Sequence, residues 1–274
     1  METREKFGSR LGFLLISAGC AIGLGNVYRF PIITGAYGGA LFVLIYLAFL
    51  LILGIPVMCA ELSVGRASQR SIATSFDVLE KPGQKWHLMK YLGIAGNYLL
   101  MMFYTVIAGW MLIYFFQFLT GGELMGLGNN IPELGAYFGG VLSKPWLLIG
   151  STAAIVIICF LVCSLGLQKG VERITKVMML ALFALIIGLA VYAFTMDGAA
   201  EGLKFYLLPD FERAKSVGIQ NVIVAAMNQA FFTLSLGIGS MAIFGSYIGK
   251  DRSLLGESVN VAILDTFFSF FDFG

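Results

Sequence analysis

The chain alternates long apolar segments with short polar ones. Apolar residues dominate six segments and a seventh that begins near residue 259; the six are 11–36, 39–63, 91–119, 146–166, 174–195 and 219–248. A helix needs about 20 apolar residues to cross the hydrocarbon core of a bilayer. Because no strongly alternating strand pattern is present, these segments predict an all-α, polytopic membrane protein rather than a β-barrel.

Two of the predicted spans are interrupted by Gly-x-Gly beside polar residues. The first break, residues 21–26, contains Gly23 and Gly25, and the second break, residues 233–240, contains Gly237 and Gly239. Glycine in a helix interior is unfavourable by roughly 1 kcal/mol relative to alanine. Paired interruptions in corresponding spans are typical of the central binding site of a transporter, so both spans are expected to be broken helices.

Composition and charge support a membrane location and predict an orientation. The chain is 58% hydrophobic and 12% charged, whereas a soluble domain is about half apolar and a quarter charged. Thirteen of the eighteen basic residues fall on one side of the predicted spans: Arg4, Lys6, Arg10, Arg66, Arg70, Lys81, Lys85, Lys90, Lys169, Arg173, Lys176, Lys250 and Arg252. The positive-inside rule then predicts a multi-pass protein of the cell membrane with a cytoplasmic N-terminus, and places the 120–145 and 196–218 loops outside.

We expect a single transmembrane domain over residues 1–274, without a soluble domain. The two broken spans point in opposite directions by the charge rule, which is what an inverted repeat produces. The first repeat is expected over about 1–195, and the second begins at about 219 and is unfinished at Gly274. The sequence therefore predicts the first repeat and the start of the second, with about six or seven transmembrane helices.

Four ionisable residues fall inside predicted spans, where such groups are costly and commonly functional. They are Arg29, Glu61, Asp265 and Asp272. A bound cation would keep Asp265 ionised; the alternative is a carboxylate bonded to neighbouring hydroxyls. Oxygens of Asn26, Thr233 and Asp265, with carbonyls freed by the breaks, favour sodium over a transition metal. Taken singly, Asn26 and Thr233 are as compatible with helix packing.

The remaining candidates lie around the two breaks. Glu61 is expected to accept hydrogen bonds from N–H groups freed at the second break, with direct ion binding as the alternative. Arg29 either gates an outer vestibule or extends to the membrane interface. N–H groups at the first break would attract a substrate carboxylate, to which Tyr104 can donate. Phe231 and Phe232 would cover the ligand or belong to the core.

Enzyme chemistry is not expected. His87 is the only histidine, and all four cysteines, Cys20, Cys59, Cys159 and Cys163, lie in apolar spans, so neither a histidine-based metal site nor a disulfide framework is predicted. The glycines at 19–25 follow no predicted strand, which excludes a nucleotide-binding loop. No nucleic-acid partner is expected.

Four stretches of this chain resemble the neurotransmitter:sodium symporter family, and in particular its bacterial amino-acid transporters with the leucine-transporter fold. The stretches are Gly23–Pro31, Gly54–Glu61 with Gly65 and Arg66, Gly166–Glu172, and Phe231–Gly237. The resemblance extends over about residues 1–266. It implies sodium-coupled symport of an amino acid by alternating access.

The resemblance also implies roles for individual residues. One sodium site would use the Ala21 carbonyl with Asn26, Thr233 and Asp265, and a second the carbonyls of Gly19 and Ile22. Substrate contacts would come from Ala21, Leu24, Gly25, Leu100, Tyr104, Phe232, Thr233, Ser235 and Ile238. Arg29 and Gln229 would form the outer gate, and Arg4 and Tyr247 the inner one. Glu61 would support the second break.

Several positions refine or depart from the family pattern. Gly23 stands where monoamine carriers have an aspartate, which favours an amino-acid substrate, and Asp265 supplies a fixed negative charge that predicts chloride independence. Cys20 replaces a common asparagine and Phe7 a common tryptophan. Residues 267–274 diverge, and the chain then ends where the family has several more spans. The chain is therefore expected to be truncated, and the alternative to a symporter is a non-transporting fragment or a channel-like or regulatory membrane protein.

Overall fold

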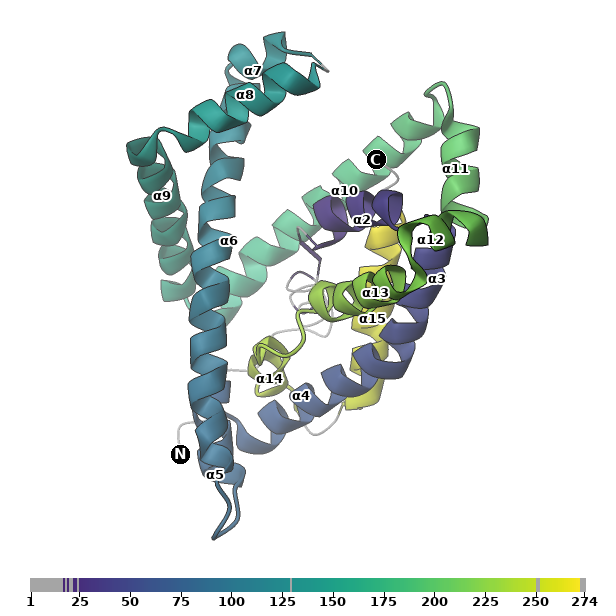
Figure 1. Ribbon diagram of the computed structural model, residues 1–274. Helices are drawn as coiled ribbons and strands as arrows, with labels where there is room; N and C mark the ends of the chain where they lie inside the picture. The colour runs from purple at the N-terminus through teal and green to yellow at the C-terminus, as the bar shows by residue number, and fades with distance from the viewer. Residues whose placement is uncertain are drawn as a thin grey trace. The chain divides into compact units, whose positions relative to one another are not determined.

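The computed structural model describes residues 17, 19, 22–23, 25–128, 130–249 and 252–271. Over these residues the chain forms helices and turns, with no strand among them (Figure 1). The chain divides into two compact units, one formed by residues 1–93 and 167–274 and the other by residues 94–166. The predicted all-α fold is confirmed for the part of the chain that is described.

The larger unit contains both breaks. Its helices are η1 (Gly25–Arg29), α2 (Phe30–Ala36), α3 (Ala40–Phe49), η2 (Leu50–Gly54), α4 (Ile55–Ser68), α5 (Ile72–Leu79), η3 (Trp86–Leu88), η4 (Leu167–Glu172), α10 (Arg173–Phe194), α11 (Ala199–Leu207), α12 (Phe211–Val217), α13 (Ile219–Thr233), α14 (Ser240–Gly245) and α15 (Leu254–Phe271). The segments η1, η2 and η4 are π-helical, and η3 is a 3₁₀ turn.

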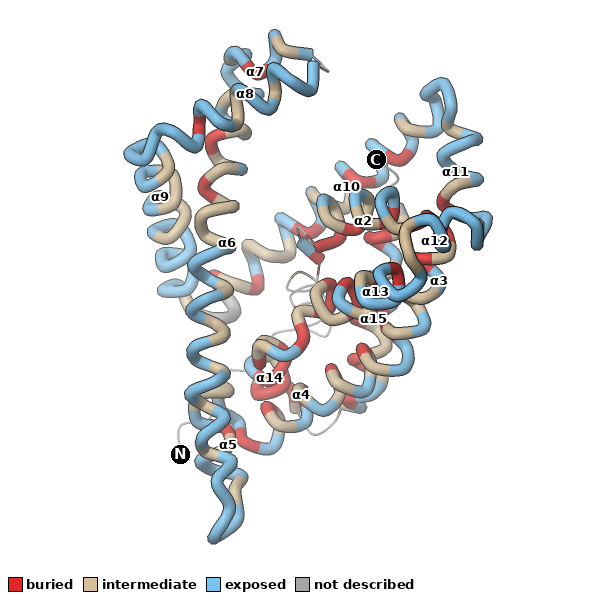
Figure 2. Tube along the Cα trace, in the orientation of Figure 1, coloured by how far each residue is buried: buried red, intermediate tan, exposed pale blue. Residues whose placement is uncertain are grey.

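The smaller unit holds most of α6 (Met89–Leu119), with α7 (Glu123–Gly126), α8 (Ile131–Leu142) and α9 (Pro145–Ser164). No residue of α9, which is described along its whole length, is buried (Figure 2). An apolar helix without a buried residue is the pattern of a helix that faces lipid.

Four helical stretches are long and apolar enough to cross a membrane: 40–68, 86–119, 145–164 and 170–194. They correspond to four of the predicted spans. The span predicted at 219–248 is instead two shorter helices, α13 and α14, separated by residues 234–239. The last helix begins at Leu254 rather than near 259, because polar residues such as Glu257 and Ser258 are buried in its first turns.

Backbone conformation explains why the second break ends a helix. Gly237 has φ +86° and Ser235 has φ +51°, both in the left-handed region. Glycine enters this region without steric cost, whereas a side chain does so rarely. Two left-handed residues so close together cannot continue a right-handed helix. In the first segment, η1 begins at Gly25, and α2 continues directly from it.

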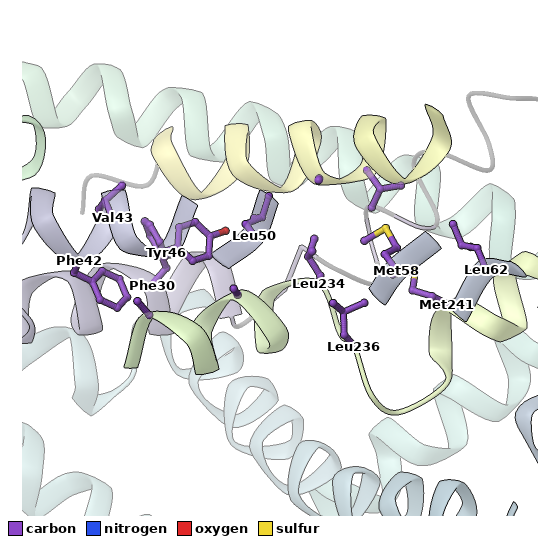
Figure 3. Packing of buried hydrophobic residues seen from close by; sticks show 14 of the residues in the cluster. Phe30, Phe42, Val43, Tyr46, Leu50, Met58, Leu62, Leu234, Leu236 and Met241 are labelled. Carbon is purple, nitrogen blue, oxygen red and sulfur yellow. The ribbon is translucent and has the colours of Figure 1, made fainter. Parts of the chain in front are cut away.

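A hydrophobic core surrounds the second break and the helices beside it. Phe30, Tyr46, Met58, Leu234 and Met241 are among its fully buried members (Figure 3). The rings of Phe30 and Tyr46 meet edge to face, with their centroids 5.1 Å apart. This core joins α3 and α4 to α13, α14 and α15 around the second break.

Helices α4 and α14 approach unusually closely through two glycines. A Cβ atom added to Gly65 would meet the carbonyl group of Ala242, and one added to Gly245 would meet the backbone of Leu62. Each helix thus presents a glycine to the backbone of the other. A larger residue at either position would have to push the two backbones apart.

We predict that Gly65→Ala lowers the stability of the protein by about 1–3 kcal/mol, the usual cost of overpacking. Thermal unfolding in detergent measures the effect. Gly188→Ala is the matched control, because Gly188 lies within α10 and a Cβ atom there meets no atom within 4 Å. A Gly65→Ala protein that unfolds at the same temperature as the Gly188→Ala protein would contradict the close approach.

Candidate functional site

Asn26, in the first break, bonds to residues far away in the sequence. Its side chain is fully buried in η1. Its Nδ2 group lies 2.7 Å from Asp265 Oδ1, 3.0 Å from Thr233 Oγ1 and 2.8 Å from Ser269 Oγ. Its Oδ1 accepts from the backbone N–H of Gly23 at 3.2 Å. Asn26 therefore joins the first break to α13 and α15.

Asp265 stands at the centre of this cluster and has no exposed surface. The Thr233 hydroxyl lies 3.1 Å and 3.0 Å from its two carboxylate oxygens. The Tyr46 hydroxyl, from α3, lies 3.4 Å from Oδ2. The three side chains that the sequence analysis assigned to one sodium site, those of Asn26, Thr233 and Asp265, thus converge. We call these three residues the oxygen cluster.

The donor set of the oxygen cluster fits a hard cation. It offers a carboxylate, a hydroxyl and an amide oxygen, with no thiolate or imidazole among these three residues. In the present arrangement Asn26 turns its N–H₂ toward the carboxylate. The two ends of an amide have nearly the same shape. Rotation of the amide by half a turn would present Oδ1 to a cation in exchange for its bond from the Gly23 N–H.

Two site residues were missed by the sequence analysis. Ser269 accepts from Asn26 and donates to the Asp265 carbonyl at 3.1 Å. It lies one helical turn after Asp265, so its spacing alone could have identified it. Tyr46 carried no such signal, because it is one aromatic residue among many in an apolar segment.

Gln229 forms a hydrogen bond with the backbone of the first break. Its Nε2 group donates to the carbonyl oxygen of Gly25 at 2.8 Å, and the side chain is fully buried. This bond ties the backbone of the first break to α13. The structure thus places Gln229 against the backbone of the first break, and its role in an outer gate stays a prediction.

Phe232 lies between the first break and Arg29. The guanidinium carbon of Arg29 is 4.3 Å from the centroid of the Phe232 ring, within the range of a cation–π contact. A Cβ atom added to Gly25 would lie 3.0 Å from the same ring. Gly25 therefore lets Phe232 pack directly onto the backbone of the first break, while Arg29 covers the ring.

Glu61 makes the contact expected of it at the second break. Its Oε1 accepts from the backbone N–H of Gly237 at 2.6 Å. Within the same break, the Ser240 hydroxyl donates to the Ser235 carbonyl oxygen at 2.9 Å. The carboxylate therefore satisfies an N–H group that the broken helix leaves without a helical partner.

The other predicted site residues are placed as follows. Ser235 and Ile238 are half-buried in the second break, and Tyr247 is half-buried after α14. Ile22 is buried beside Met179 of α10, and a Cβ atom on Gly19 would also meet Met179. Leu100 and Tyr104 lie on α6, in the unit formed by residues 94–166. The predicted site residues Arg4, Ala21, Leu24 and Asp272 lie outside the described residues, as do Phe7 and Cys20.

Comparisons with known proteins point to one family. The profile of the sodium:neurotransmitter symporter family matches residues 4–124 and 143–273. The chain is 34% identical over 260 residues to the uncharacterized sodium-dependent transporter YhdH of Bacillus subtilis, covering 95% of this chain and 56% of that protein. It is 30% identical to a sodium- and chloride-dependent taurine transporter of Bos taurus, covering 89% and 44%.

A solved structure has the same fold. The crystal structure of MhsT in complex with L-phenylalanine superposes with a TM-score of 0.85 at 41% sequence identity, covering 99% of this chain and 60% of that one. The chain spans about half the length of the curated relatives it matches.

We predict that Glu61→Ala opens the second break, because it leaves the Gly237 N–H without its acceptor. A hydrogen bond to a charged group contributes about 1.5–3 kcal/mol, so amide hydrogen exchange in residues 234–239 should accelerate about 10- to 150-fold. Ser63→Ala is the control, since the Ser63 hydroxyl bonds only to the Ala60 carbonyl of its own helix. Equal exchange rates in the two variants would show that Glu61 does not support the break.

Proposed function

Because this chain belongs to the sodium:neurotransmitter symporter family, we propose that it carries out sodium-coupled symport of an amino acid by alternating access. The observation that carries the proposal is the convergence of Asn26, Thr233 and Asp265 between the two breaks. A coupled site would need to join the two proposed repeats, and Asn26 belongs to the first whereas Thr233 and Asp265 belong to the second. We further propose that the protein lies in the cell membrane with a cytoplasmic N-terminus.

The oxygen cluster supports coupling through charge. A buried carboxylate in a low-dielectric site attracts a cation strongly, and a sodium ion entering a negative interior gains roughly 2.3 kcal/mol per 100 mV. The substrate carboxylate is proposed to complete the same sodium shell, with the carbonyl of Ala21. Each ligand then raises the affinity for the other, as reciprocal linkage requires. A second sodium would use carbonyls of Gly19 and Ile22.

The proposed substrate is an amino acid with an apolar or aromatic side chain. Its carboxylate would meet N–H groups of Leu24 and Gly25, and its ammonium the carbonyl and hydroxyl oxygens of the second break. A substrate amine without a carboxylate of its own would need one from the protein at position 23, and Gly23 has no side chain to supply it. The structure of MhsT, the 41% identical relative, contains L-phenylalanine, which supports a large apolar side chain here.

Chloride independence is a finer part of the proposal. A mobile anion beside a sodium site balances the charge of the cation when the protein offers none. Asp265 has a fixed carboxylate at that point, with Tyr46 and Ser269 beside it. The taurine transporter related to this chain is described as chloride-dependent, so the proposal assigns the two proteins different chloride requirements.

We predict that the purified chain binds L-phenylalanine or L-leucine saturably in sodium and loses that binding when potassium replaces sodium. Scintillation proximity with tritiated amino acids measures it, and uptake into proteoliposomes under an inward sodium gradient tests transport. Thr233→Val should raise the sodium concentration at half-saturation about 10- to 100-fold, since it removes a hydrogen-bonding ligand of a charged group.

Thr34→Val is the matched control. The Thr34 hydroxyl is buried and has no hydrogen-bond partner among the described residues, so its replacement should leave sodium dependence unchanged. Amino-acid binding that is equal in sodium and potassium would overturn the symport proposal. Ion flux without amino-acid binding would favour the channel-like alternative.

A further inference from the structure

The turn between α5 and α6 is a second place where the structure gathers charge. We call residues 77–91 the basic turn. Its two acidic residues, Asp77 and Glu80, both have partners. Lys90 Nζ lies 3.2 Å from Asp77 Oδ1, and Glu80 Oε2 accepts from the backbone N–H of His87 at 2.8 Å. The ring nitrogen Nδ1 of His87 is also 2.9 Å from the Glu80 carboxylate.

Hydrogen bonding from His87 keeps the Glu80 carboxylate charged and fixed. The backbone N–H of His87 donates to it and lowers the pKa of Glu80, and the side chain of His87 adds to this effect. The carboxylate is thus committed to His87 and does not neutralise the neighbouring lysines. The turn itself is closed by the Lys81 N–H, which donates to Gln84 Oε1 at 3.2 Å.

Lys81 and Lys85 are left as uncompensated positive charges. Both side chains are exposed, and neither forms an ion pair with any residue that the structure describes. They lie four positions apart on either side of the turn at Pro82 and Gly83. A pair of lysines held in this way presents two cationic groups to whatever lies against the turn.

Exposed aromatic side chains follow the two lysines in the sequence. Trp86 is 56% exposed although its ring stacks on Phe76, and Tyr91 is 64% exposed. Trp86 is also the first residue of the membrane-length stretch 86–119. Tryptophan and tyrosine are enriched where a transmembrane helix meets the headgroup region, so the basic turn lies at the level of lipid headgroups.

We propose that the basic turn is a docking surface for the headgroups of anionic phospholipids, with Lys81 and Lys85 contacting the phosphates and Trp86 lying in the interface. Charge complementarity carries this choice, because the acids of the turn are already paired and only cationic groups remain free. Polybasic segments at a membrane surface gain affinity for acidic lipids with each lysine. The inference is independent of the transport proposal, since it needs only that the protein lies in a bilayer.

The test uses Trp86 as the probe. In a Trp110→Phe/Trp146→Phe background Trp86 is the one tryptophan, and its quenching by dibrominated phosphatidylglycerol is compared with that by dibrominated phosphatidylcholine. We expect phosphatidylglycerol to be preferred at low salt, with the preference falling as salt is added. Lys81→Gln/Lys85→Gln should reduce the preference up to about thirtyfold, to a value near one.

Lys144→Gln/Lys204→Gln is the matched control, because it removes two exposed lysines outside the turn. Its lipid preference should equal that of the parent. Should the single-tryptophan background fold poorly, the unfolding temperature of the otherwise unchanged chain in phosphatidylcholine nanodiscs with and without phosphatidylglycerol replaces quenching. No preference in the parent, or an equal loss in both double variants, would overturn the proposal.

Discussion

The burial of the Asp265 carboxylate is the constraint on which the rest of the larger unit depends. An ionised carboxylate without exposed surface is very costly unless its oxygens are hydrogen-bonded or paired with a cation. Here the partners come from the first break, from α13 and from α3, through Asn26, Thr233 and Tyr46. The same group therefore draws the first break, α3 and α13 toward α15, and it is the group that we propose to hold a cation.

The two breaks differ in what holds them. At the first, Gln229 bonds to the Gly25 carbonyl and Phe232 packs on the same glycine. At the second, Glu61 bonds to the Gly237 N–H, and its helix α4 is locked against α14 by glycines on both sides. The second break is thus fixed to α4 both through the Glu61 side chain and through the close approach of the two backbones, whereas the first is tied through the side chains of Gln229 and Phe232. In each break a backbone group is hydrogen-bonded by a side chain from another helix.

Most of the helices and both breaks could be predicted from the sequence, because long apolar segments and the glycines that interrupt them are strong local signals. The cluster of Asn26, Thr233 and Asp265 followed from polar groups in apolar spans together with the family resemblance, and Glu61 from its position at the end of a span. The sequence did not reveal Tyr46, the Gln229 bond to Gly25 or the start of α15 at Leu254. The contacts of Tyr46 and Gln229 depend on which helix faces pack together. The start of α15 was missed because buried polar residues near a helix end resemble loop residues in a sequence.

The most direct test of the account is the sodium and chloride dependence of amino-acid binding in Asp265→Asn. In the unchanged protein, the sodium concentration at half-saturation should be the same in chloride and in gluconate. In Asp265→Asn, that concentration should rise about tenfold or more, because a buried cation then lacks its counter-charge. Chloride should restore part of the lost sodium affinity. A variant with unchanged sodium and chloride dependence would show that the buried carboxylate of Asp265 does not hold the ion.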